Sequence, residues 1–245
     1  MAKPTLEIRC DWGADGVAAL APYTDVFIVV DVLFATTAID QAVSQGASVI
    51  PFLYRADTAD VFAKGQRAFL ARPKEAADPG TYSDLPSTLT GLAPGVRLAM
   101  PAADVAAIVR AASTTGEEVE PTVLAGCLRN AGAVADTARR MGRRISIICA
   151  GERWPRGGLR PAVEDMLGAG AIAHRLEGSQ SPEAMAARAA FRAAWDNLPR
   201  SLAGSATGYS LCRSGYTEDV TEAAALNVSP YTPVFIDGAF RAAEW

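Results

Sequence analysis

The feature that most restricts the possible folds of this chain is an alternation of short, wholly apolar segments with alanine-rich segments of helical length. Residues 144–150 (RISIICA) are almost continuously apolar, as expected for an interior strand of a parallel sheet whose two faces are both covered. Residues 27–31 and 47–52 have a similar character and flank a helical segment that ends at Gly46. We expect these two strands to be parallel, because a helix connects them.

The same alternation continues toward the C-terminus. It predicts strands at 96–100, 122–127 and 232–236, the last with a turn back at 237–238, and helices at 102–112, 130–142, 161–176, 182–197, 201–212 and 219–226. Residues 53–95 are rich in Pro, Gly and Ser and predict irregular loops around a weak strand at 68–71. We therefore predict a three-layer α/β/α fold with a largely parallel or mixed central sheet, built as a single domain over 1–245 or as two closely packed lobes with the site between them.

Local signals also predict how three of the helices begin. Thr36 or Thr37 can cap the first helix, Asn130 is well placed to cap the helix after 122–127, and Pro161 suits a first helical turn.

The composition excludes several classes of protein. With 245 residues, half of them hydrophobic, the chain can bury a large core, so it is neither disordered nor collagen-like. Its net charge of −4 argues against nucleic acid as a partner. Its apolar runs are shorter than the roughly 20 residues that span a bilayer, and its N-terminus lacks the basic segment followed by an apolar segment that is typical of a signal peptide. We therefore predict a cytoplasmic protein without a membrane partner. The four cysteines are far apart and are expected to be buried free thiols.

Charged side chains fall where the predicted strands end. Ligands of open α/β sheets bind beyond the carboxyl ends of the strands, and Asp31, Arg129 and Glu152 follow three of them. Glu164 and Asp165 lie early in a predicted helix, where the helix dipole alone could explain them. Carboxylates of this kind suit Mg²⁺, which commonly takes one or two from the protein. Asp31 could instead cap a loop.

An anion site can be inferred beside these carboxylates. Thr36 and Thr37, with backbone N–H groups at a helix start, could face an anion. Arg129, Arg153 and Arg160 could supply cations, although surface arginines are more often simply solvated. Together these residues predict a site for a small polyanion and its metal.

Several known phosphatase designs are excluded by the residues present. The single histidine, His174, lies on the apolar face of a predicted helix, where packing or a dipole role is expected, so a pair of catalytic histidines is impossible. Cys149 and Arg156 bracket six residues, whereas a cysteine-loop phosphatase brackets five. The second aspartate of an aspartyl-phosphatase motif would occupy the position of Leu33. A serine-hydrolase elbow and a P-loop are also absent from the sequence.

Four segments resemble, in order and spacing, the 2-phosphosulfolactate phosphatase (ComB-like) family. They are VVDVLFATTAIDQAVSQGASVIP, VLAGCLRNAGAVA, ICAGERWPRGGLRPAVEDMLGAGAIAHRL and GYTEDVTEAAALN with PVFIDGAF. The resemblance implies a Mg²⁺-dependent phosphatase that converts 2-phosphosulfolactate to sulfolactate on a three-layer α/β fold. The residues on the family pattern are Asp31, Thr36, Thr37, Arg129, Asn130, Glu152, Arg160, Glu164 and Asp165.

The resemblance and the residue chemistry together give a set of expected roles. Catalytic roles are expected for Asp31, Glu152 and Asp165, and metal binding for Asp31, Glu152 and Glu164. Substrate binding is expected for Thr36, Thr37, Arg129, Asn130, Arg153 and Arg160. Asp31 is either a metal ligand or a nucleophile that forms an aspartyl-phosphate.

Three departures from the family pattern support a second hypothesis. The family's first motif usually runs D-V-L-R-A-T, but here Phe34 replaces the arginine. The family's P-N-G-[ST] is replaced by Pro101 followed by Ala102 and Ala103, and Leu85 stands where relatives have a serine. The alternative is therefore a ComB-like protein with an altered substrate or a non-catalytic role in binding a small anion. The apolar tail, 233–245, could also pack against a second copy in a homodimer.

Overall fold

The computed structural model describes residues 5–78, 80–114 and 120–243, so the last two residues of the tail 233–245 lie outside the described residues. The strands are β1 (Glu7–Trp12), β2 (Val26–Val30), β3 (Ser48–Phe52), β4 (Phe69–Leu70), β5 (Arg97–Pro101), β6 (Thr122–Gly126), β7 (Arg144–Cys149), β8 (Glu152–Arg153), β9 (Leu159–Arg160), β10 (Ser179–Gln180), β11 (Pro233–Ile236) and β12 (Ala239–Ala242). The α-helices are α1 (Gly13–Leu20), α2 (Ala35–Val43), α3 (Ala59–Gly65), α4 (Ala103–Ala112), α5 (Ala131–Met141), α6 (Val163–Arg175), α7 (Pro182–Ala194), α8 (Leu198–Gly204), α9 (Ala206–Arg213) and α10 (Thr217–Ala223).

A mixed sheet of ten strands forms the middle layer, in the order β10-β1-β7-β2-β6-β11-β12-β3-β5-β4. The strands β10, β1, β7, β2 and β6 pair in parallel, and so do β3, β5 and β4. The β11–β12 hairpin joins these two parallel parts through antiparallel contacts, Val234 with Leu124 and Phe240 with Val49. The predicted turn at Asp237 and Gly238 is confirmed, since both residues have the positive φ that a tight hairpin turn requires.

The prediction that the strands at 27–31 and 47–52 run parallel is wrong, because β2 is parallel to β6 and three successive antiparallel pairings then lead from β6 through the β11–β12 hairpin to β3. β2 lies between β7 and β6, whereas β3 lies between β12 and β5. The connection through α2 therefore carries the chain across the sheet instead of to the neighbouring position, and the C-terminal hairpin fills the gap.

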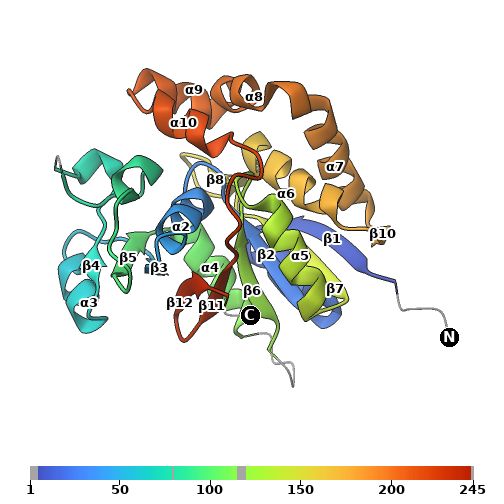
Figure 1. Cartoon of the computed structure of the whole chain (residues 1–245), viewed down its shortest axis with the longest axis horizontal. Coiled ribbons are helices and arrows are strands. Elements are labelled where there is room, and N and C mark those ends of the chain that lie inside the picture. The colour runs from blue at the N-terminus through green and yellow to red at the C-terminus, as the bar shows by residue number, and fades with distance from the viewer. Residues whose placement is uncertain (1–4, 79, 115–119, 244–245) are drawn as a thin grey trace.

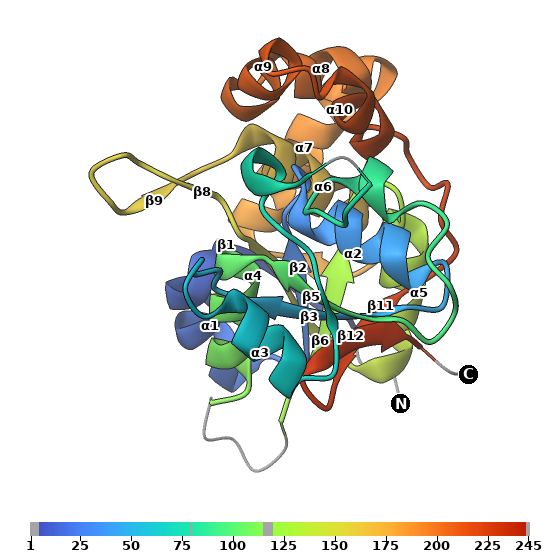
Figure 2. The same cartoon turned by 90° about the vertical axis from the view of Figure 1, so that its left-hand side faces the viewer.

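Helices cover both faces of the sheet, which confirms the three-layer α/β/α prediction (Figures 1 and 2). Alternate residues of β2 point to opposite layers: Ile28 packs in one core cluster with Val134 of α5, and Val29 packs in the other with Ile108 of α4. Helices α5, α6 and α7 thus lie on one face, and α1, α2 and α4 on the other. The interior position of β7 follows the prediction for 144–150.

Several elements differ from the sequence prediction. β1 with α1, and also α3, were not predicted. The predicted helix at 201–212 is two helices, because Ser205 ends α8 and its side chain caps α9 by accepting a hydrogen bond from the Gly208 N–H. Pro161 precedes α6 instead of lying in its first turn. The weak strand predicted at 68–71 is present as β4.

Two other expectations concern membrane-spanning helices and the cysteines. In the part of the chain that is described, no helix is long and apolar enough to cross a membrane. All four cysteines are free thiols, and Cys10, Cys127 and Cys149 are buried, whereas Cys212 is partly exposed.

Candidate active site

A small cavity of about 150 Å³ lies where several strands of the sheet end. Asp31 follows β2, Gly151 and Glu152 follow β7, and the segment from Pro101 to Asp104 joins β5 to α4. The remaining lining residues are Leu33, Phe34, Ala35, Lys74, Asp84, Ala102 and Ala103. The strand-end rule therefore brings Asp31 and Glu152 together, as the sequence predicted.

Asp31 is held at the rim of this cavity by its own backbone. Its carbonyl oxygen accepts hydrogen bonds from the N–H and the hydroxyl of Thr36, at 2.9 and 2.7 Å, and its side chain accepts a long hydrogen bond from the Ala35 N–H. Burial raises the pKa of Asp31 to about 7, and the negative charges of Glu152, Asp104 and Glu164 contribute to the same shift. The carboxyl of Asp31 therefore lies in a concentration of negative charge.

Two adjacent acids in the first turn of α6 are both buried, but their oxygens have different partners. Asp165 accepts the N–H of Val32 and the N–H of Gly151, both at 2.8 Å, and so ties the end of β2 to the end of β7. Burial and the charge of Asp31 raise the pKa of Asp165 well above its usual value, although these two hydrogen bonds oppose the shift. Glu164 Oε1, in contrast, has no hydrogen-bond partner in the described part of the chain.

Glu152 begins the β8–β9 hairpin, which projects from the body of the protein (Figure 2). Glu152 lies opposite Arg160 in the hairpin register, and the hydroxyl of Thr207 in α9 links the two side chains: it donates to Glu152 Oε1 at 3.4 Å and accepts from Arg160 Nη2 at 3.0 Å. Burial raises the pKa of Glu152, while Arg160 opposes the shift. Arg160 is therefore close to Glu152 but does not line the cavity itself, and it also lies over the ring of Trp154.

These acids fit a divalent cation. A buried carboxylate oxygen without a partner and several carboxyls with mutually raised pKa values are stabilised when a cation binds among them. Among the described residues, no three His, Cys, Asp or Glu side chains form a ready-made metal cage. Mg²⁺ needs none, because it commonly keeps several waters and takes one or two carboxylates. Asp31, Glu152 and Glu164 are the residues that could supply them.

The predicted anion-binding residues of the first two motifs have internal partners. α2 begins at Ala35, so Thr36 and Thr37 lie inside the helix and do not cap it. Both threonines are buried, and the Thr37 hydroxyl donates to the Val32 carbonyl at 2.8 Å. Asn130 occupies the N-cap position of α5 as predicted, but its side chain bonds back to the end of β6 through the Cys127 N–H and the Ala125 carbonyl.

Arg129 is not brought to this cavity. Its guanidinium donates to Asp40 at 3.1 Å and to Gln41 at 3.1 Å, and it lies 3.2 Å from Glu222; its side chain is only 12% exposed. Asp40 is fully buried and also accepts a hydrogen bond from Ser229. Burial raises the pKa of Asp40, and Ser229 and Arg129 oppose the shift. Arg129 therefore joins α2 to the C-terminal part of the chain.

Arg153 lies at the edge of the site but is already paired. It forms an ion pair with Asp104 at the start of α4, and its side chain is 63% exposed. Lys74, Asp84 and Asp104 line the cavity but were not among the predicted site residues. Lys74 and Asp84 belong to the stretch 53–95, which has no regular pattern, so only the tertiary structure shows that they reach the strand ends.

The departures from the family pattern fall on the wall of the same cavity. Phe34, Ala102 and Ala103 line it directly, and Leu85 is buried in the adjoining core. The positions at which the family pattern has an arginine and an asparagine therefore face the site.

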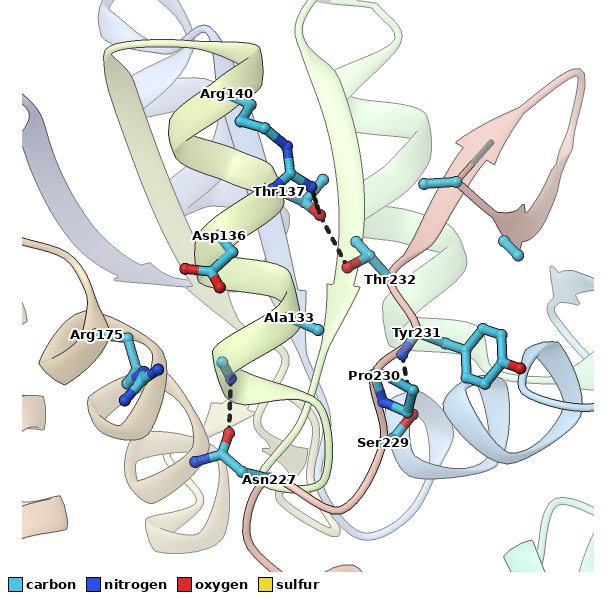
Figure 3. A pocket seen from close by; sticks show the side chains of 13 residues that line it. Ala133, Asp136, Thr137, Arg140, Arg175, Asn227, Ser229, Pro230, Tyr231 and Thr232 are labelled. Atoms are coloured by element: carbon cyan, nitrogen blue, oxygen red, sulfur yellow. Dashed lines mark hydrogen bonds between the residues drawn. The ribbon is translucent and has the colours of Figure 1, made fainter. Parts of the chain in front are cut away.

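A larger cavity, of about 790 Å³, lies elsewhere, between α5 and the segment from Asn227 to Thr232 (Figure 3). Asn227 accepts the Gly132 N–H at 2.7 Å, and the hydroxyls of Thr137 and Thr232 are 3.1 Å apart. This groove lacks the converging acids of the smaller cavity and lies away from Asp31, so the chemistry favours the smaller cavity as the active site.

Comparison with known proteins points to one family. A family model described as 2-phosphosulpholactate phosphatase matches residues 17–238. A protein of Methanothermobacter thermautotrophicus named 2-phosphosulfolactate phosphatase is 27% identical to this chain over 224 residues, which cover 89% of this chain and 89% of that protein. The matched region includes every residue that lines the smaller cavity.

Proposed function

Because this chain belongs to the 2-phosphosulpholactate phosphatase family, and is thus a phosphoric monoester hydrolase, we propose that its substrate is 2-phosphosulfolactate and that hydrolysis depends on Mg²⁺. The observation that carries this proposal is that Asp31 and Glu152 line one cavity at the strand ends, close enough to Glu164 of α6 for its charge to act on both. Phosphoryl transfer needs little more from a protein than positioning and electrostatic stabilisation, and such a cluster supplies a place for the cation.

Each acid has its own part in this proposal. Asp31, Glu152 and Glu164 would hold Mg²⁺, which when bound neutralises charge on the phosphoryl oxygens. Asp165 holds the ends of β2 and β7 in register through its two backbone hydrogen bonds, which is a positioning role. Glu152 is oriented by Thr207 and can accept a proton from an attacking water.

Asp31 has a second possible role, as a nucleophile that forms an aspartyl-phosphate. Its carboxylate lies at the rim and accepts, from the described part of the chain, one long hydrogen bond from the Ala35 N–H, which leaves an oxygen available for either role. Rapid quenching of a reaction with ³²P-labelled substrate distinguishes the two, because only the nucleophile leaves label on Asp31. Asp31→Ala should abolish activity in both cases, and full activity in this variant would refute both.

The test of the whole proposal is a phosphate-release assay with and without Mg²⁺. We expect turnover of 2-phosphosulfolactate that stops when EDTA removes the metal. Glu152→Gln and Glu164→Gln should each weaken Mg²⁺ activation, whereas Asp57→Asn, which changes an exposed acid outside the cavity, should leave it unchanged. Equal rates with and without divalent metal would refute the metal role.

A second candidate is a related protein with an altered substrate or a role in anion binding alone. The observation that favours it is the apolar wall formed by Phe34, Ala102 and Ala103 where the family pattern has polar groups. A panel of small phosphate esters distinguishes the candidates, since a binding protein would be thermally stabilised by anions but release no phosphate. If Phe34→Arg changed neither anion binding nor turnover, the apolar wall would no longer support an altered substrate or a role in binding alone.

The cellular context completes the proposal. A small phosphate ester is the expected partner, and the cytoplasm the proposed location. A homodimer involving the C-terminal tail remains a prediction that sedimentation would check.

A further inference from the structure

The cavity beside Asp31 is strongly acidic, although its substrate would be an anion. Its described lining includes the carboxyls of Asp31, Asp84, Asp104 and Glu152, and a single basic side chain, Lys74. An anionic ester approaching this wall would meet mostly negative charge, so any cation in the lining has a large effect on binding.

Lys74 is held in place by the loop that carries it. The backbone N–H of Lys74 donates to Asp84 Oδ1 at 2.8 Å, which fixes the backbone at the cavity, and the Lys74 side chain is only 21% exposed. The ammonium lies 3.2 Å from Glu75 Oε1 and 3.7 Å from Asp84 Oδ2. An ammonium has three donors, and the contact with Asp84 is too long for a hydrogen bond, so Lys74 retains donor capacity toward the cavity.

Lys74 is also close to the acids of the site. Its positive charge acts on the Glu152 carboxyl, and both side chains line the same cavity. Burial alone would lower the pKa of Lys74, but the charges of Asp84 and Glu75 raise it above its usual value, so the side chain stays cationic.

Two of the three arginines predicted to bind substrate do not fill this role, and the third, Arg160, is bonded to Thr207 and does not line the cavity. Arg129 is occupied by Asp40 and lies outside the cavity lining, and Arg153 is paired with Asp104. The position that carries an arginine in the family pattern carries Phe34 here, on the same cavity wall. The cavity therefore lacks a cation at that point and has one, Lys74, from a different segment.

We propose that Lys74 binds the phosphate group of the substrate, as the cation in the lining that it shares with Asp31 and Glu152, and that it serves in place of the arginine absent at position 34. This inference rests on the proposed function. It adds a specificity-determining residue from a part of the chain in which no motif marks the site.

The experiment compares Lys74→Met, Lys74→Arg and, as a matched control, Lys64→Met, which changes an exposed lysine on α3. In the presence of Mg²⁺, calorimetry gives the Kd for inorganic phosphate, and steady-state kinetics give KM and kcat for 2-phosphosulfolactate. Loss of one charge-assisted hydrogen bond corresponds to roughly a tenfold or larger change. We expect Lys74→Met to raise both Kd and KM by at least that factor, Lys74→Arg to recover most of the loss, and Lys64→Met to match the unmodified protein.

The outcomes separate this inference from the proposed function. Turnover with an unchanged Kd and KM in Lys74→Met would refute the role of Lys74 and leave the phosphatase intact. If the unmodified protein bound phosphate but hydrolysed no ester, and Lys74→Met weakened that binding, the role of Lys74 would be supported and the phosphatase activity refuted. Failure of the unmodified protein to bind phosphate or release it would refute both. If Lys74→Met lowers the melting temperature, Lys74→Gln gives the same comparison, and equal loss in Lys74→Arg would indicate a structural role.

Discussion

Two neighbouring acids of α6 offer a matched pair of variants with opposite expected effects. Asp165→Asn and Glu164→Gln each replace a buried carboxyl group in the first turn of α6 by an amide of nearly the same shape. Glu164→Gln therefore serves as the control for replacing a carboxyl group in this turn. The difference between them measures the hydrogen bonds that Asp165 makes and Glu164 Oε1 does not.

The magnitude follows from the partners of Asp165. Both of its oxygens accept buried backbone N–H groups, from Val32 and Gly151. An asparagine keeps one acceptor and turns an NH₂ group toward the other N–H, so one hydrogen bond is lost and a buried donor is left unpaired. A buried donor left unpaired costs roughly 1–3 kcal/mol, so the unfolding free energy of Asp165→Asn should lie about 2 kcal/mol below that of Glu164→Gln. Such a loss is a large part of the 5–15 kcal/mol that typically separates folded from unfolded protein.

The assay is urea denaturation followed by circular dichroism, with EDTA present so that bound metal does not stabilise either protein. Glu164→Gln should unfold at the urea concentration of the unmodified protein or above it, because its removed charge had no hydrogen-bond partner at Oε1. It should nevertheless lose the stabilisation that Mg²⁺ adds. If the two variants had the same unfolding free energy, Asp165 would not tie β2 to β7.

Three further predictions concern other charged residues. Arg129→Met leaves Asp40 buried without its cation, so the unfolding free energy should fall by about 3–5 kcal/mol. The KM of the protein that remains folded should stay within about twofold. A large rise in KM without loss of stability would instead place Arg129 at the substrate. Because the pKa of Asp31 is raised from 3.8 to about 7, protonated Asp31 stabilises the folded protein, and in EDTA this stabilisation should be lost as pH rises through about 7. Asp31→Asn should therefore become more stable relative to the unmodified protein over that range. Parallel pH profiles of the unfolding free energy would contradict this. Arg153→Ala should change the melting temperature little, because its ion pair with Asp104 is largely exposed, and a loss above about 1 kcal/mol in denaturation would show a greater role for that pair.

The layer architecture could be predicted from the sequence because it depends on local patterns. The continuous apolar run of β7 requires cover on both faces, and the structure supplies it. The order of the strands could not be predicted, since the β11–β12 hairpin comes from the far end of the chain and separates β6 from β3. β1 had a usable signal: in EIRCDW the apolar residues Ile8 and Cys10 alternate with polar ones and are buried.

The acids of the site were predictable for the same reason. Asp31 and Glu152 each follow a strand, and neighbouring parallel strands end at one edge of the sheet. The partners of the arginines were not predictable, because Arg129 finds Asp40 on the inner face of α2 and Glu222 on α10, far away in the chain. Lys74 carries no local signal at all, since the loop around it has no repeating pattern.

Among the described residues, most of the cations near the site are already paired, whereas several of its acids are not. Arg129 is neutralised by Asp40 and Glu222, and Arg153 by Asp104, so neither offsets the carboxyls of Asp31 and Glu164. The burial that raises the pKa of Asp31 would be relieved by any cation that enters. An anionic ester, in contrast, is repelled until such a cation is present. If the enzyme works as proposed, we therefore expect a divalent metal to bind before or together with the substrate, because it would relieve the repulsion among these acids and between them and the ester.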